Sequence, residues 1–145
     1  MLVLQIAILL FVLMELSNVI ILYRKPDFKY GNSMRVFCAF RALQPQSDAY
    51  IFVKYLVNWV ANCKLIFLTM LVVVAVWGDL IVLRWAVFAT ILSIGIFFFT
   101  LYPLMKKLDD HNEITPKGYT KTLSMMILSF MLMFTVALIA SFIVA

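Results

Sequence analysis

The 145-residue chain is poor in the residues that build most cofactor and phosphate sites, with 4 glycines, 2 cysteines and 1 histidine. The glycines are too scattered to form a phosphate-binding loop. Cys38 and Cys63 are too few for a disulfide framework or a cysteine-type zinc site within one chain. The lone imidazole, that of His111, excludes a haem held by two histidines in a monomer. We therefore expect no cofactor.

Charged residues are also scarce, at 13% of the chain, whereas 66% of the residues are hydrophobic. A soluble domain has about 25% charged and about 45–50% apolar residues. The mean hydropathy of +1.06 is too high for one small soluble core, because small domains leave much of their surface exposed. The composition predicts an integral membrane protein, excludes most soluble enzymes and gives no reason to expect a nucleic-acid partner.

Four apolar runs have the length of about 20 residues that a helix needs to cross a bilayer. They lie at about residues 1–22, 56–77, 80–102 and 121–144. Backbone groups in hydrocarbon must bond within their own segment, so all four runs are predicted to be helices. We expect a single all-α membrane domain, residues 1–145, in which four transmembrane helices form an antiparallel bundle. Its two longer connections cover about residues 23–55 and 103–120.

The basic residues predict the orientation of the bundle. Segment 24–54 has six lysines and arginines against two acids, and segment 106–121 has four lysines against three acids. By the positive-inside rule, both connections are expected in the cytoplasm. Both termini and the short turn at Gly78–Asp79 are then on the non-cytoplasmic side. We expect a multi-pass protein of the plasma membrane, which in a bacterium is the inner membrane.

The first connection has the pattern of an amphipathic helix. Ser33 can cap its start and Pro45 can end it, and Arg35 and Arg41 flank an apolar face. That face consists of Val36, Phe37, Phe40 and Leu43. The pattern predicts a cytoplasmic interfacial helix at the headgroups, with its arginines near lipid phosphate. Such a helix either only orders the loop or provides a docking surface for a partner or for anionic lipids.

Glu15 is the first intramembrane residue that needs explanation, because an ionised group at the centre of a helix costs about 2.5–3.5 kcal/mol. Lys64 is predicted to lie at a similar depth on the second run, so an ion pair within the bilayer is geometrically feasible. The alternative is a hydrogen-bonded network of Glu15, Asn18 and Asn62. Asn58 shares a helix face with Asn62, whereas Lys64 points almost opposite to Asn62. Lipid-facing or intersubunit placements of these polar groups also remain open.

The second connection concentrates acids and the lone histidine. Its weak candidates for a divalent ion are Asp109, Asp110, His111 and Glu113. The glycine and the final bidentate glutamate of a calcium loop are missing, so we expect a solvated turn and no metal. Thr115 followed by Pro116 has the pattern of a helix start, which predicts that the fourth helix begins before the membrane.

Small residues at four-residue spacing mark two helices, because such spacing lets helices approach closely. They are Ala89 and Ser93 in the third run and Ala137 and Ser141 in the fourth. These faces are expected to pack inside the bundle. The alternative is that the face of Ala137 and Ser141 forms a dimer.

These features leave three classes of function open. We expect a non-enzymatic accessory, assembly or regulatory component that acts through oligomer or partner contacts and has no catalytic residues. Its expected partners are membrane lipids, including anionic headgroups, and further copies of the chain or a larger membrane complex. The alternatives are a small oligomeric transporter or channel that uses the polar cluster around Glu15, and a lipid-modifying membrane enzyme.

Overall fold

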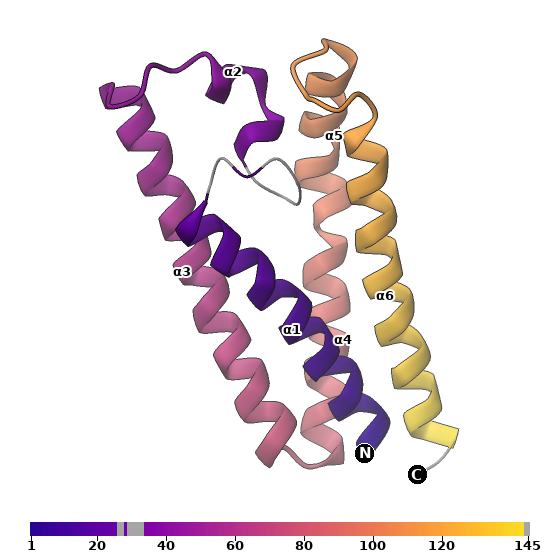
Figure 1. The fold of residues 1–145 in the computed structure, drawn as a ribbon. Helices are drawn as coiled ribbons and strands as arrows, with labels where there is room; N and C mark the ends of the chain where they lie inside the picture. The colour runs from indigo at the N-terminus through magenta and orange to yellow at the C-terminus, as the bar shows by residue number, and fades with distance from the viewer. Residues whose placement is uncertain (26–27, 29–33, 144–145) are drawn as a thin grey trace.

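The structure, a computed structural model, is all-helical and describes residues 1–25, 28 and 34–143. Four helical segments are long and apolar enough to cross a membrane, and they pack as a bundle (Figure 1). The long helices are α1 (Leu2–Arg24), α3 (Asp48–Trp77), α4 (Leu80–Gly95), α5 (Phe97–Asp110) and α6 (Tyr119–Ile143). Helices α4 and α5 together form one of the four segments. The predicted all-helical bundle of four segments that could each cross a membrane is confirmed.

The start of α1, the end of α6 and the turn from α3 to α4 lie at one end of the bundle, which we call the terminal end (Figure 1). Residues 34–47 of the first connection and the turn from α5 to α6 lie at the opposite end, which we call the loop end (Figure 1). At the terminal turn, Gly78 ends α3 and Asp79 caps α4, since its carboxylate accepts a hydrogen bond from the N–H of Val82 at 2.8 Å. Helices α3 and α4 are therefore antiparallel neighbours joined by a short turn, as the sequence predicts.

Helix α1 packs against α3, α4 and α6. Its Phe11 contacts two rings of α6 edge to face, with centroid distances of 5.1 Å to Phe130 and 5.3 Å to Phe134. The most deeply buried large side chains come from α1, α4 and α6, and they are Leu4, Ile8, Val19, Leu83, Val87 and Phe134. The main core thus lies between α1 and the helices that pack against it.

The third segment differs from the single helix predicted over residues 80–102. The α-helix is interrupted at Ile96, and α5 continues beyond Pro103 to Asp110. The extension forms because Met105 is buried against Ile114 and Leu123, so the last turns of α5 gain apolar contacts outside the apolar run. The predicted loop at 103–120 shortens accordingly.

The predicted continuous helix from Ser33 to Pro45 is wrong for the part that the structure describes. A 3-10 turn, η1 (Met34–Val36), is followed by the short helix α2 (Cys38–Arg41). Between them Phe37 forms an antiparallel β-bridge with Ile114, and this extended backbone cannot continue a helix. The expected cap at Ser33 lies outside the described residues.

The β-bridge joins the two connections at the loop end. The N–H of Cys38 donates to the carbonyl of Glu113, and the N–H of Thr115 donates to the carbonyl of Val36, both at 2.8 Å. A second apolar cluster lies beneath the bridge, and its buried members are Val36, Phe97, Met105, Ile114 and Leu123. We call the bridge between Phe37 and Ile114, together with this apolar cluster, the loop clamp.

Helix α6 begins at Tyr119, so the predicted start at Thr115 and Pro116 is wrong. Thr115 instead pairs with the first connection through its backbone N–H. The start of α6 is capped by Asp109 of α5, whose two carboxylate oxygens accept from the N–H groups of Gly118 at 2.9 Å and Thr120 at 3.3 Å. A carboxylate at this position also favours the helix dipole.

Candidate functional site

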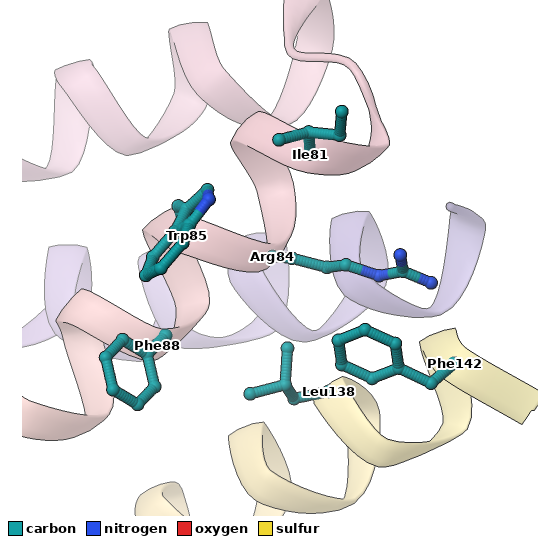
Figure 2. Close-up of a pocket in the computed structure, with 6 residues that line it drawn as sticks. All are labelled: Ile81, Arg84, Trp85, Phe88, Leu138 and Phe142. Carbon is teal, nitrogen blue, oxygen red and sulfur yellow. The ribbon is translucent and has the colours of Figure 1, made fainter.

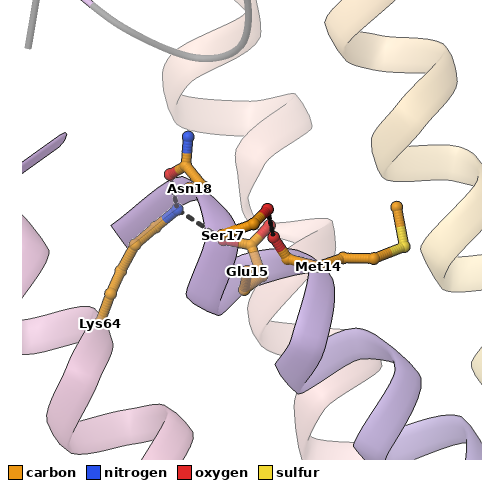
Figure 3. A network of polar contacts seen from close by, with 5 residues as sticks. All are labelled: Met14, Glu15, Ser17, Asn18 and Lys64. Carbon is orange, nitrogen blue, oxygen red and sulfur yellow. Dashed lines mark hydrogen bonds and ion pairs between the residues drawn. The ribbon is translucent and has the colours of Figure 1, made fainter. Parts of the chain in front are cut away.

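The structure brings together Glu15 and Asn18 of α1 and Lys64 of α3 (Figure 3). The ammonium nitrogen of Lys64 lies 2.6 Å from Oε2 of Glu15 and donates to Oδ1 of Asn18 at 3.0 Å. The side chains of Lys64 and Glu15 are 32% and 17% exposed. Among the described residues, this is the only salt bridge.

The network forms because α1 and α3 pack along each other more extensively than any other pair of helices. Glu15 and Asn18 are three residues apart and therefore lie on the same face of α1. Asn62 lies two residues from Lys64 on α3, on a different face, and is exposed. Asn58 is half-buried. The carboxylate is thus held by Lys64, and Asn62 stays outside the network.

A lateral cavity of about 510 Å³ lies beside the ion pair. Its walls come from α1, α3, α4, α5 and α6, and they include Phe11, Phe67, Leu68, Ile94, Phe97, Leu101, Met126 and Phe130. Its polar groups are those of Glu15, Lys64, Ser93 and Thr100. Helix α3 diverges from α5 towards the loop end, which leaves this space open (Figure 1). Its volume falls within the range of about 300–1,000 Å³ typical of ligand pockets.

The hydroxyl groups of the apolar helices, both buried and exposed, bond mainly to their own helices. Examples in α4, α5 and α6 are Thr90, Thr100, Ser124, Ser129 and Thr135, which all donate to the carbonyl four residues earlier. Towards the terminal end, Gln5 donates to the carbonyl of Ala75 at 2.8 Å and thereby joins α1 to α3. These hydroxyl and amide donors are thus bonded to backbone carbonyls, whereas a transport path would need them to face the transported species.

The two small-residue faces have different environments. Ala137 and Ser141 are 4% and 3% exposed, so they pack inside the bundle and their face is unavailable for a dimer. Ala89 and Ser93 are exposed on α4, and Ser93 lines the lateral cavity. The expectation that both faces pack internally therefore holds only for the fourth span.

The candidate metal ligands do not gather, since no group of three or more histidine, cysteine or acidic side chains exists in residues 1–25, 28 and 34–143. Asp109 caps α6, whereas Asp110, His111 and Glu113 are exposed.

Only part of the predicted lipid or partner surface is exposed. Arg35 and Arg41 are both exposed, and Arg41 also donates to Oγ1 of Thr115 and to the sulfur of Cys38, both at 2.9 Å. Phe37 lines the lateral cavity. Phe40 is buried and stacks on Tyr50 with a centroid distance of 5.6 Å. Three of these four side chains thus contribute to the fold of the loop end.

Arg84 is a further candidate residue, and the sequence patterns described above do not single it out. Its Nε donates to Oγ of Ser141 at 3.1 Å, and its Nη2 donates to the carbonyl of the same residue. The guanidinium lies 3.9 Å from the centre of the Phe142 ring (Figure 2). The sequence does contain a signal for this role, because Arg84 follows the α4 cap, Asp79, by about one turn and is therefore a cation inside an apolar span.

Comparison with known proteins adds no family to this picture. No family model matches the chain, and no curated protein or solved structure matches it either.

Proposed function

We propose that this protein is a non-enzymatic accessory component of a membrane assembly and meets a membrane-resident partner at the lateral cavity. The observation that supports this most is the Glu15–Lys64 pair in the wall of an apolar space that is open to the side of the bundle. An ammonium group has three N–H donors, and Glu15 and Asn18 accept from Lys64. A further donor is therefore available to a polar group of a partner helix.

The exposed face of α4 next to the cavity suits close approach of such a helix. Ala89 and Ser93 have small side chains and are exposed, and small residues at this spacing allow helix backbones to come close in a membrane. An interhelical hydrogen bond in a bilayer contributes about 0.6–2 kcal/mol. The open cavity, the small residues and the lysine together favour a partner helix as the occupant.

We also propose that the loop end lies in the cytoplasm and contacts anionic headgroups. Exposed cations gather there on both sides of the loop clamp, at Arg35, Lys106, Lys107, Lys117 and Lys121. Each basic residue near an anionic surface contributes about 1 kcal/mol of attraction. The positive-inside rule favours the same orientation in the plasma membrane.

Site-specific photo-crosslinking in native membranes tests the partner proposal. A photoreactive residue at Leu101, which lines the cavity, is expected to capture one defined membrane protein. The matched control is Met70, which is exposed on α3 away from the cavity. The product at Leu101 should disappear when Ser93→Trp fills the cavity. Equal capture at both positions, or capture of lipid alone at Leu101, would contradict the proposal.

Transport is the second candidate, because Glu15 and Lys64 both line the cavity and intramembrane carboxylates often mark ion paths. It predicts a proton or ion flux through the purified protein in liposomes that Glu15→Gln abolishes. The accessory role predicts no such flux in the wild type. A flux that Glu15→Gln removes would decide for the transporter.

A further inference from the structure

A second groove lies at the terminal end, between α4 and α6 (Figure 2). It has a volume of about 500 Å³ and is lined by Ile81, Arg84, Trp85, Phe88, Leu138 and Phe142. Arg84 provides the only charged side chain among these residues, so the groove joins one cation to an otherwise apolar surface. It is separate from the cavity beside Lys64 and shares no lining residue with it.

The guanidinium of Arg84 is held in place and still has free donors. Two of its five N–H groups bond to Ser141, and the ring of Phe142 supports one of its faces. Within the described part of the chain, no carboxylate forms a salt bridge with it. A cation that is positioned in this way, with no acidic partner among the described residues, attracts an anion of matching geometry, and a phosphate accepts two hydrogen bonds from arginine.

The level of the groove in the membrane points to the source of that phosphate. Trp77 and Trp85 are 76% and 66% exposed at the terminal end. Exposed tryptophans of membrane proteins gather at the headgroup level. Arg84 is the neighbour of Trp85 in α4, so we expect its guanidinium at the level of lipid phosphates and the apolar groove at the level where acyl chains begin.

We propose that this groove binds an anionic glycerophospholipid, with the phosphate on Arg84 and an acyl chain along Trp85 and Phe88. An anionic lipid fits better than a zwitterionic one, because the ammonium of a choline headgroup would oppose the charge of Arg84. The proposal is independent of a partner at the Lys64 cavity.

Quenching of tryptophan fluorescence by brominated lipids tests this site. The chain has 3 tryptophans, so Trp59→Phe with Trp77→Phe leaves Trp85 as the reporter. In phosphatidylcholine bilayers, brominated phosphatidylglycerol is expected to quench at a mole fraction about fivefold lower than brominated phosphatidylcholine. Arg84→Met should abolish this preference and Arg84→Lys should retain part of it. Lys54→Met, which removes an exposed cation of α3 that lies outside the groove, should leave it unchanged.

Three results would overturn the proposal. Equal quenching by the two lipids would show that no anionic site exists at Trp85. An unchanged preference in Arg84→Met would show that the arginine only joins α4 to α6. Loss of the preference when inorganic phosphate replaces chloride at equal ionic strength would assign the site to free phosphate. If Arg84→Met does not fold, the comparison of the two lipids and the phosphate competition with unchanged Arg84 still decide.

Discussion

The ammonium nitrogen of Lys64 lies 2.6 Å from a carboxylate oxygen of Glu15, although the two residues are 49 positions apart in the chain. This contact joins α1 to α3, the pair of helices that pack together most extensively. Each charge lies inside an apolar span, so each gives the other a counter-ion that the lipid does not supply.

Charge reversal is expected to reveal the energy of this pair. Glu15→Lys or Lys64→Glu alone places two like charges next to each other and should lower the unfolding temperature of the purified protein in detergent. The double reversal should recover much of the loss, with a coupling energy of about 0.5–3 kcal/mol. Losses that simply add in the double variant would show that the two side chains do not interact.

Asn18 and Asn62 offer a matched comparison of two amides. Asn18 accepts a hydrogen bond from Lys64 at 3.0 Å, whereas Asn62 is exposed on α3. Asn18→Leu is therefore expected to cost about 1–2 kcal/mol of stability, and Asn62→Leu is expected to cost less or to stabilise the protein. Denaturation of both variants in the same detergent measures the difference. A larger loss for Asn62→Leu would favour a network centred on Asn62.

Asp109 and Asp110 allow a similar test of the loop end. The carboxylate of Asp109 caps α6 through Gly118 and Thr120, whereas Asp110 is exposed. Asp109→Ala should destabilise the protein by about 0.5–2 kcal/mol, and Asp110→Ala should have little effect. Hydrogen exchange should increase at Thr120 and its neighbours in the Asp109 variant only. Equal exchange in the two variants would show that Asp109 does not cap α6.

An engineered disulfide is expected to link the two connections that meet at the loop clamp. The sulfur of Cys38 lies 3.9 Å from Oγ1 of Thr115, and a side-chain rotation can bring two sulfurs at these positions to bonding distance. Thr115→Cys with Cys63→Ser should therefore form a Cys38 disulfide under mild oxidation, which mass spectrometry of non-reduced peptides detects. Lys117→Cys in the same background is the control. Faster disulfide formation in the control would contradict the pairing of the two connections.

The four membrane helices follow from the sequence because their signal is local. A run of about 20 apolar residues requires a helix wherever the chain meets hydrocarbon, and this holds before any tertiary contact forms. The depths of Glu15 and Lys64 follow from counting along such helices, so their proximity was one of the arrangements predicted. The choice between Lys64 and Asn62 depends on how α1 and α3 face each other, which sequence periodicity does not specify.

Tertiary structure decided the details of both ends of the bundle. The bridge between Phe37 and Ile114 and the contact of Arg84 with Ser141 join segments that are distant in the sequence, and the cap that Asp109 provides joins the end of α5 to the start of α6. Such contacts depend on where the helix ends meet. The apolar periodicity of the first connection is too weak to keep a continuous helix when the bridge of Phe37 to Ile114 forms. The sequence by itself determined that the chain forms four apolar helices, because burial in lipid depends on composition and length. Only the packed structure decided which polar groups meet, because that depends on the rotation and tilt of each helix against its neighbours.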